Sequence, residues 1–406
     1  MTAVQGVAGG ELEGAELTPL AFVERSERAS IIGELQVFLD DHPTSADKWY
    51  QLGVALNAAG RYEEAAAAHH IALTLSPHNR GVQCELAFAL ASVGSLEEAA
   101  SLLEEVIQCD PGNGWAYFHL ACARYRQGAC AEASLMWEVA VRCLDDPCDS
   151  LENLAMVYRR LGDTDRELSC WWRLAEIQPD SPAVVHMLGA VGLAPTPLRA
   201  SNGYVVQLFD RFAPDFDYVL KLLDYAVPEM IEAWMHTRFP QPQRSLRILD
   251  VGCGTGLCGQ RLRPWASELV GVDLSPEMLS LAQQRDLYDS LIEAEVVDYL
   301  ECGGAKFDVI VASDVLCYFG DLRAFGRHAL AALRPAGWLA FSVELIEEKE
   351  LGTGYVLESH GRYAHEQSHV EAAMGDAAEY GATKSVLRLE AGVPVAGLWV
   401  EASAAR

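Results

Sequence analysis

The stretch that decides the fold of this chain is Arg247-Ile-Leu-Asp-Val-Gly-Cys-Gly-Thr-Gly-Leu257, an apolar run followed by three alternating glycines. Residues 248–251 predict a buried β-strand. Gly252, Gly254 and Gly256 predict a tight turn, because residues without a Cβ adopt positive φ and let a ligand approach the backbone. A helix predicted after the turn directs its free N–H groups toward the same point. The stretch therefore predicts a strand, a turn and a helix that together bind a ligand.

Two cofactor patterns fit this turn. Residues 254–259 match G-x-G-x-x-G, a dinucleotide pattern that is a weak signal by itself. The second pattern places Asp250 ahead of the alternating glycines, where a carboxylate can hold the α-ammonium group of S-adenosylmethionine. This segment resembles motif I of class I methyltransferases, and the downstream segments follow in the order that this family shows. We favour the second pattern.

Beyond the turn, predicted strands and helices continue to alternate, as a doubly wound parallel sheet requires. The resemblance implies that Asp273, which ends the second strand, accepts hydrogen bonds from both ribose hydroxyls. It also implies that Glu295 binds the adenine amino group, with Asp298 as the rival because relatives more often have Asp there. The residues expected to bind S-adenosylmethionine are Asp250, Gly252, Cys253, Gly254, Gly256, Asp273, Leu274, Met278, Glu295 and Ser313.

The segment just before motif I, residues 204–218, interleaves aromatic residues with acids. In related methyltransferases such a segment forms lid helices over the cofactor. The alternative is an ordinary amphipathic helix packed in the core. Residues 193–202 contain Pro195 and Pro197 and predict a linker, so we expect the methyltransferase domain at 203–406.

Upstream of the linker the sequence repeats with a period of 34 residues, in units at 46–79, 80–113, 114–147 and 148–181. Small residues at the eighth and twentieth positions allow two antiparallel helices to pack closely, and a glycine at the fifteenth ends the first helix. The pattern resembles the tetratricopeptide repeat. It implies an all-α solenoid over 20–192, with a leading half-repeat and a capping helix.

The two resemblances together imply an α plus α/β fold class, in which this solenoid precedes a Rossmann-like class I methyltransferase domain. Such arrays usually bind a peptide or protein on their concave face, or associate with a second copy to form a homodimer. A packing domain that binds no separate ligand is the alternative.

The acceptor substrate is expected where the fourth and fifth strands end, because ligands bind at the carboxyl ends of strands in open α/β sheets. An Arg-Pro-x-Gly turn at 334–337, typical of this enzyme class, precedes the fifth strand. Residues 361–365 resemble a feature of predicted methyltransferases with tetratricopeptide repeats, which implies that they line the substrate pocket; a surface hairpin is the alternative. The candidate catalytic residues are His365, Asp314 and Glu344 as bases, in that order, and Tyr363 in the pocket.

His365-Glu-Gln-Ser-His369 also matches the zinc pattern H-E-x-x-H. That chemistry needs both imidazoles on one face of a helix and a third ligand downstream. We expect the helix to begin near Gln367, and no later histidine exists. The sequence therefore favours a site without metal.

The composition restricts the partners and the compartment. A net charge of −28 repels phosphate backbones, which disfavours nucleic-acid substrates. The sequence contains no run of eighteen apolar residues, so it predicts no transmembrane helix. Residues 1–19 are acidic and Gly/Ala-rich, so we expect a disordered tail there instead of a signal peptide. The eleven cysteines lie in apolar segments without a C-x-x-C pair, which indicates reduced thiols in a cytoplasmic protein.

We hypothesise a methyltransferase enzyme that transfers the methyl group to an oxygen or nitrogen atom. Its substrate is a small molecule or is presented by a protein partner that docks on the repeats. The first alternative is a protein or peptide methyltransferase whose substrate the repeats bind directly. The second is a scaffold whose methyltransferase domain senses the cofactor without catalysis.

Overall fold

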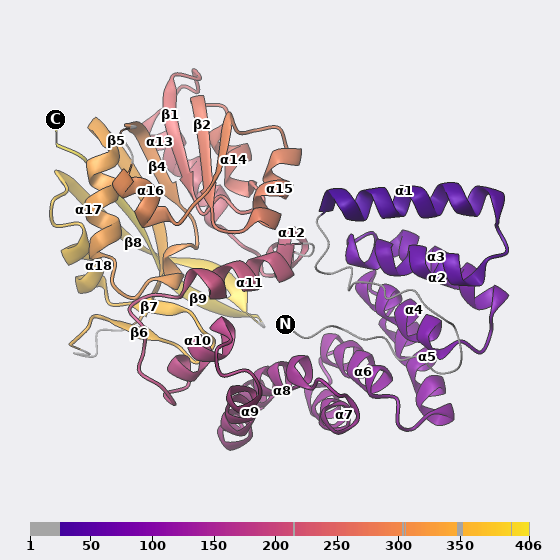
Figure 1. The fold of residues 1–406 in the computed structure, drawn as a ribbon. Coiled ribbons are helices and arrows are strands. Elements are labelled where there is room, and N and C mark those ends of the chain that lie inside the picture. Colours follow the sequence, from indigo (N-terminus) through magenta and orange to yellow (C-terminus); the bar gives the residue numbers. More distant parts are fainter. Residues whose placement is uncertain are drawn as a thin grey trace. The chain divides into compact units, whose positions relative to one another are not determined.

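The computed structural model describes residues 25–213, 216–302, 304, 306–346, 352–390 and 392–405. The chain divides into two compact units, residues 1–177 and 178–406 (Figure 1). In its described part the first unit is helical throughout, and the second contains a nine-stranded sheet. The α plus α/β fold class is thus confirmed. The tail predicted at 1–19 lies outside the described residues, and no described helix meets the length and apolarity that a membrane span requires.

The first unit is a series of paired helices. They are α1 (Arg25–Asp41), α2 (Ala46–Ala58), α3 (Tyr62–Leu75), α4 (Arg80–Ser92), α5 (Leu96–Cys109), α6 (Gly114–Arg126), α7 (Cys130–Cys143), α8 (Cys148–Leu161) and α9 (Thr164–Ile177).

The sequence period of this unit is visible in its backbone. The first helices of four successive pairs, α2, α4, α6 and α8, begin 34 residues apart. Each pair turns at a glycine of positive φ: Gly60 at +71°, Gly94 at +94°, Gly128 at +83° and Gly162 at +74°. Glycine occurs there because side chains with a Cβ disfavour this left-handed region. The turn therefore recurs at the same point of every pair.

Small residues let the two helices of a pair approach closely. Ala65, Ala99 and Ala133, at equivalent positions of three pairs, have no exposed surface. Gly53 serves another purpose, because a Cβ there would overlap the imidazole of His69, which is itself completely buried. Burial lowers the pKa of His69 to about 4, so this ring packs as a neutral group.

Replacing Gly53 with alanine should destabilise the repeat unit. The new methyl group would force the His69 ring out of its place, and overpacking of this kind costs about 1–3 kcal/mol. Gly33→Ala is the matched control, because no atom outside its own helix lies within 4 Å of the new Cβ. Thermal unfolding of both variants checks this. An unchanged melting temperature for Gly53→Ala would contradict the packing described.

The second unit begins with helices and continues as an α/β domain. Its elements are α10 (Pro182–Ala190), α11 (Asn202–Phe212), α12 (Phe216–Leu222), α13 (Val227–Arg238), β1 (Leu246–Val251), α14 (Leu257–Leu262), β2 (Ala266–Asp273), α15 (Pro276–Gln284), β3 (Ser290–Glu293), α16 (Val296–Cys302), β4 (Phe307–Ala312), η3 (Leu316–Tyr318), α17 (Arg323–Ala332), β5 (Leu333–Leu345), β6 (Tyr355–Leu357), β7 (Tyr363–His365), α18 (Gln367–Ala373), β8 (Glu379–Glu390) and β9 (Val393–Ser403).

The sheet has the order β3-β2-β1-β4-β5-β7-β6, and β9 joins β5 to β8. Strands β1 to β5 are parallel, and β9 is antiparallel to both β5 and β8. The chain reverses direction across the sheet between β1 and β4, which is the topological switch point where open α/β sheets bind ligands. This topology directs the carboxyl ends of β1, β2, β4 and β5 to one edge.

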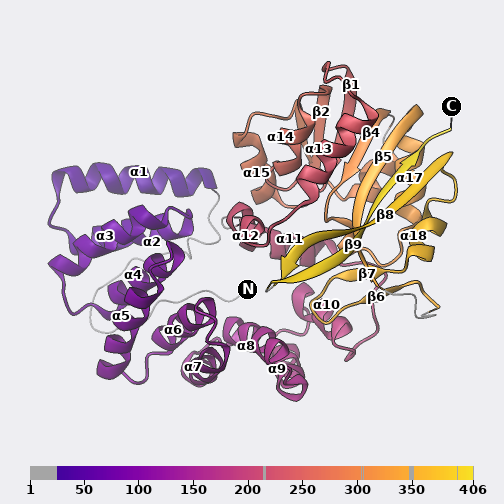
Figure 2. The ribbon, with the colours of Figure 1, turned by 180° about the vertical axis from the view of Figure 1, so that it is seen from behind.

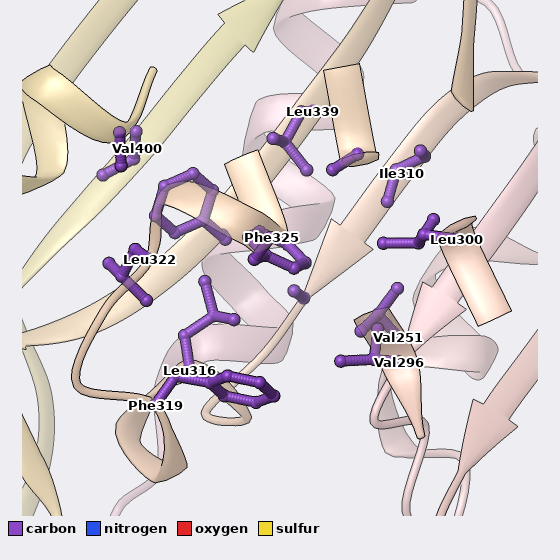
Figure 3. Close-up of a cluster of buried hydrophobic side chains, with 14 of the residues drawn as sticks. Val251, Val296, Leu300, Ile310, Leu316, Phe319, Leu322, Phe325, Leu339 and Val400 are labelled. Atoms are coloured by element: carbon purple, nitrogen blue, oxygen red, sulfur yellow. The ribbon is translucent and has the colours of Figure 1, made fainter. Parts of the chain in front are cut away.

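Two apolar cores cover the two faces of the sheet. On one face, α16 and α17 contribute Leu300 and Phe325 to a cluster with Val251, Ile310 and Leu339 of the strands (Figure 3). On the opposite face, α13 and α14 pack through their own buried residues. Figure 2 shows α13 lying across the strands from behind. Buried strands covered by helices on both faces explain the continuous apolar runs in the sequence.

Helix α10 packs within this second unit. His186 is buried, its Nε2 lies 2.8 Å from the carbonyl oxygen of Gly361, and its ring stacks on Tyr204 of α11 with centroids 4.0 Å apart. A Cβ on Gly361 would lie 2.9 Å from Met187 Sδ. The helix that the sequence analysis expected to cap the repeats is therefore placed against the turn that joins β6 to β7. The domain boundaries themselves remain a prediction.

Candidate active site

The turn after β1 is bonded to the end of β2. The amide nitrogens of Gly252 and Cys253 donate to the carbonyl oxygen of Val272, at 2.8 and 3.1 Å. Gly252, Gly254 and Gly256 have φ of +62°, +53° and +91°. A side chain at Gly252 would also meet Val315, whose Cγ2 lies 2.7 Å from the position of a Cβ. The backbone is thus left bare where the strand ends.

Asp250 lies beneath this turn with no exposed surface. Its Oδ2 accepts a hydrogen bond from the hydroxyl of Tyr288 at 2.7 Å, whereas its Oδ1 has no hydrogen-bond partner in the described part of the chain. Burial raises the pKa of Asp250 to about 7, although the Tyr288 bond opposes this. A buried carboxylate oxygen without a donor is costly, so it is suited to a cationic ligand.

Asp273 accepts backbone hydrogen bonds with both carboxylate oxygens, one from the glycine turn and one from the residue before α15. Oδ2 accepts from the amide nitrogen of Gly254 at 2.8 Å, and Oδ1 accepts from that of Ser275 at 2.9 Å. Burial raises its pKa, and these backbone donors oppose the rise. Each oxygen can still accept a second bond, so the carboxylate can receive ligand hydroxyls. Close by in the chain, Leu274 is half-buried and Met278 is buried.

Glu295 and Ser313 lie at the ends of other elements. Glu295 precedes α16, and its Oε2 accepts from the amide nitrogen of Asp298 at 2.8 Å, as a helix cap does. Its Oε1 is 3.5 Å from a guanidinium nitrogen of Arg199. Ser313 follows β4, and its Oγ lies 3.3 Å from Cys258 Sγ. Asp298, the rival to Glu295, contributes a backbone donor to this cap.

Helices α11 and α12 contact the glycine turn and the residues that follow β2 and α15. Asp210 of α11 accepts a hydrogen bond from Ser275 Oγ at 2.6 Å. Asp217 of α12 accepts from Thr255 Oγ1 at 2.5 Å and pairs with Arg285. The ring of Phe216 lies 3.7 Å from the position of a Cβ on Gly254. These contacts support the proposal that the segment is a lid.

Asp314 and Glu344, two of the predicted bases, are brought together by an arginine that the sequence analysis did not select. Arg388 of β8 is 1% exposed and donates to Asp314 Oδ2 at 3.0 Å and to Glu344 Oε1 at 2.5 Å. Burial raises the pKa of Asp314, and Arg388 opposes this. For Glu344, burial is outweighed by Arg388 and Arg362, and its pKa falls below the ordinary value.

The same cluster extends to three further groups. Arg362 lies 3.3 Å from Glu344 Oε1 and 3.6 Å from Glu390 Oε1, and Arg388 Nε donates to Glu390 at 2.8 Å. His360 Nε2 is 4.0 Å from Glu344 Oε2, and the side chain is 40% exposed. Burial lowers the pKa of His360, against the opposing effect of Glu344. The imidazole is therefore neutral at pH 7 and partly accessible.

His365, the first-ranked base of the sequence analysis, occupies a different environment. It has no exposed surface, and its Nε2 donates to the carbonyl oxygens of Phe319 and Gly320 at 2.8 and 3.2 Å. Tyr363 is equally buried and donates its hydroxyl to the carbonyl oxygen of Pro197 at 2.7 Å. Both side chains tie backbone segments together. Because both side chains are buried and already donate to carbonyl oxygens, neither is well placed to accept a proton from a substrate.

The zinc-like pattern is also divided between elements. His365 ends β7, whereas His369 lies in α18, which begins at Gln367. His369 Nε2 is 3.4 Å from the amide nitrogen of Leu322. Among the residues that the structure describes, no group of three or more histidine, cysteine or acidic side chains is arranged to hold a metal ion.

The buried state of His365 predicts a pH dependence. Burial lowers its pKa to about 4, whereas in the unfolded chain it takes up a proton near pH 6.5. The contribution of the neutral ring is therefore complete above pH 6.5 and is lost as the pH falls toward 4. His365→Gln, which keeps a donor near the two carbonyl oxygens, should reduce this acid destabilisation.

Urea unfolding at pH 7.0, 5.5 and 4.5 measures the effect, with His328→Gln on α17 as the matched control. His69 and His119 contribute a similar loss in every variant, because burial lowers the pKa of both to about 4. The difference between variants is thus the result to compare. The same loss for His365→Gln and the wild type would contradict the assignment.

Comparison with known proteins assigns both parts of the chain. Residues 208–371 match a family model described as a methyltransferase domain, and residues 23–150 match one described as the TPR domain of cytochrome c-type biogenesis protein H. Methyltransferase-like protein 27 from Homo sapiens is 42% identical over 100 residues, which cover 23% of this chain and 41% of that protein. The chain thus spans about two fifths of the length of this curated relative.

Solved structures also resemble each part. The N-methyltransferase NodS from Bradyrhizobium japonicum, in complex with S-adenosyl-l-homocysteine, is 19% identical with a TM-score of 0.36, over 50% of this chain and 99% of that one. TTC0263, a TPR protein of Thermus thermophilus, is 17% identical with a TM-score of 0.38, over 42% and 92%. The two family models identify residues 23–150 as a helical-repeat segment of the TPR type and residues 208–371 as a methyltransferase domain.

Proposed function

We propose that this chain is an S-adenosylmethionine-dependent methyltransferase. The observation that carries the proposal is the bare glycine turn, with the buried Oδ1 of Asp250 beneath it and Asp273 bonded to Gly254. When bound, S-adenosylmethionine would supply an electrophilic methyl group on a sulfonium. Its chemical groups fit the donor set, because it offers an α-ammonium group for Asp250 and ribose hydroxyls for Asp273. S-adenosylmethionine carries no phosphate group that the carboxylates of Asp250 and Asp273 would repel.

The remaining predicted cofactor residues take supporting roles. Met278 and Leu274 supply apolar surface for the adenine, next to Ser275, which caps α15. Glu295 Oε1, which lies 3.5 Å from the Arg199 guanidinium but accepts no hydrogen bond among the described residues, is the proposed acceptor for the adenine amino group. Phe216 and Asp217 of α12 contact the turn at Gly254 and Thr255.

We place the acceptor substrate beside Asp314, Glu344 and His360. The cluster contains three carboxylates and two guanidinium groups, so it has one excess negative charge. This charge favours a neutral or cationic acceptor over a carboxylate or phosphate. An oxygen or nitrogen nucleophile of that kind has a proton to lose. His360, near Glu344 and partly exposed, is better placed to accept it than His365.

The repeat unit provides the second half of the proposal. Helical-repeat units present extended concave surfaces, so we propose that this one docks a protein partner that carries or regulates the substrate, or a second copy of the chain. All eleven cysteines are free, four of them at least partly exposed, which supports a reducing compartment such as the cytoplasm. A protein substrate bound directly by the repeats is the second candidate.

Calorimetric titration with S-adenosylhomocysteine and with NAD tests the cofactor. We expect the wild type to bind S-adenosylhomocysteine, and NAD to bind at least tenfold more weakly. Asp273→Ala should abolish binding, because it removes both the ribose acceptor and the bond that holds Gly254. Asp376→Ala, an exposed acid after α18, is the control and should bind like the wild type. Preference for NAD would refute the proposal.

Removing the repeat unit separates the two candidate substrates. A fragment of residues 178–406 keeps α10 and its bond between His186 and Gly361, unlike one that starts after the linker prolines. We expect it to methylate the same small molecules as the full chain when each is incubated with radiolabelled S-adenosylmethionine and a cell extract. If labelled protein appears with the full chain and label disappears altogether with the fragment, the repeats present the substrate directly.

A further inference from the structure

One tyrosine contacts several parts of the cofactor turn, although it belongs to none of them. Tyr288 lies between α15 and β3, and its hydroxyl donates to Asp250 Oδ2 at 2.7 Å. The side chain is half-buried, and this burial together with Asp250 raises the pKa of the hydroxyl well above its ordinary value. The hydroxyl therefore keeps its proton at neutral pH and can donate it to Asp250.

Three glycines make room for this ring. A Cβ on Gly259 would lie 2.6 Å from Tyr288 Cζ, one on Gly271 3.0 Å from Cδ1, and one on Gly256 3.1 Å from Cε2. These distances leave no space for a methyl group at Gly259 or Gly271. The last glycine of the G-x-G-x-x-G match thus admits an internal tyrosine, which explains its presence without a dinucleotide.

Among the residues that the structure describes, the groups that act on the pKa of Asp250 include no positive charge. The groups that face it are the Tyr288 hydroxyl, the thiols of Cys253 and Cys258, and the carboxylate of Asp273. Burial and Asp273 both favour the protonated form, and the Tyr288 bond opposes them. Its second oxygen, Oδ1, remains without a partner in the described part of the chain.

We propose that Tyr288 is a positioning residue, which keeps Asp250 ionised and leaves Oδ1 available for the α-ammonium group of the cofactor. The inference rests on the proposed function. The tyrosine occupies Oδ2 from inside the protein, so a cationic ligand has one oxygen to address. A protonated Asp250 could not attract that cation, because the charge of the carboxylate would be lost.

The sign of the pH effect follows from this arrangement. The ammonium group binds the ionised carboxylate, so affinity falls as the pH falls through the pKa of Asp250. Without the Tyr288 hydroxyl that pKa rises further, because a hydrogen bond to the charged form is lost. The decline in affinity should therefore start at a higher pH in Tyr288→Phe than in the wild type.

The test is calorimetric titration of the full chain with S-adenosylhomocysteine between pH 6 and 9. Tyr288→Phe keeps an aromatic ring against Gly256, Gly259 and Gly271 and removes the hydroxyl that donates to Asp250. We expect the dissociation constant at pH 7 to rise about tenfold and the midpoint of the pH profile to move up by about one unit. Asp250→Asn should bind weakly at every pH.

A second probe separates positioning from general damage. 5′-Methylthioadenosine has the same adenosine group without the ammonium, so its affinity should be the same in Tyr288→Phe and in the wild type. Tyr299→Phe on α16 is the matched control and should leave both ligands unaffected. An unchanged pH profile, or equal weakening of both ligands, overturns the role of Tyr288. A wild type that binds 5′-methylthioadenosine but not S-adenosylhomocysteine overturns the proposed function as well.

Discussion

The bond between Asp273 Oδ2 and the amide nitrogen of Gly254 is the interaction on which the rest of the site depends. It joins the turn after β1 to the end of β2, and Gly252 and Cys253 reinforce it through the carbonyl oxygen of Val272. Because both strands are buried and paired in register, the turn has little freedom to move. Helices α11 and α12 are bonded to this edge of the sheet, Asp210 through Ser275 and Asp217 through Thr255.

The carboxyl edge of the sheet carries buried charges of two kinds. Under the cofactor turn, Asp250 has a neutral donor and a free oxygen, which makes it costly until a cation arrives. At the end of β5, Glu344 already has its cation in Arg388, so its charge is satisfied. Loss of one partner from a buried pair costs about 3–5 kcal/mol, which suits Arg388 to a lasting structural role. The first kind prepares a binding site, and the second shapes the space beside it.

The sequence predicted the parts of this protein that depend on local pattern. The strand, turn and helix around Asp250 and the 34-residue repeat were identified because their spacing is short-range. The acceptor side depends on contacts between distant residues. Arg388 is 74 residues from Asp314 and 44 from Glu344 in the sequence. A local sequence pattern therefore does not predict that these side chains form a cluster. His365 was ranked first by residue type, but its partners are backbone carbonyl oxygens 45 and 46 residues away, which a sequence pattern does not reveal.

We propose that the glycine turn and its two aspartates bind S-adenosylmethionine through a carboxylate oxygen, Asp250 Oδ1, that has no partner among the described residues. A crystal structure of the chain with S-adenosylhomocysteine bound tests it most directly. We expect the amino group of the ligand within hydrogen-bond distance of Asp250 Oδ1, the ribose hydroxyls at Asp273, and Tyr288 still bonded to Oδ2. A ligand bound elsewhere, or one whose amino group lies away from Asp250, would contradict it.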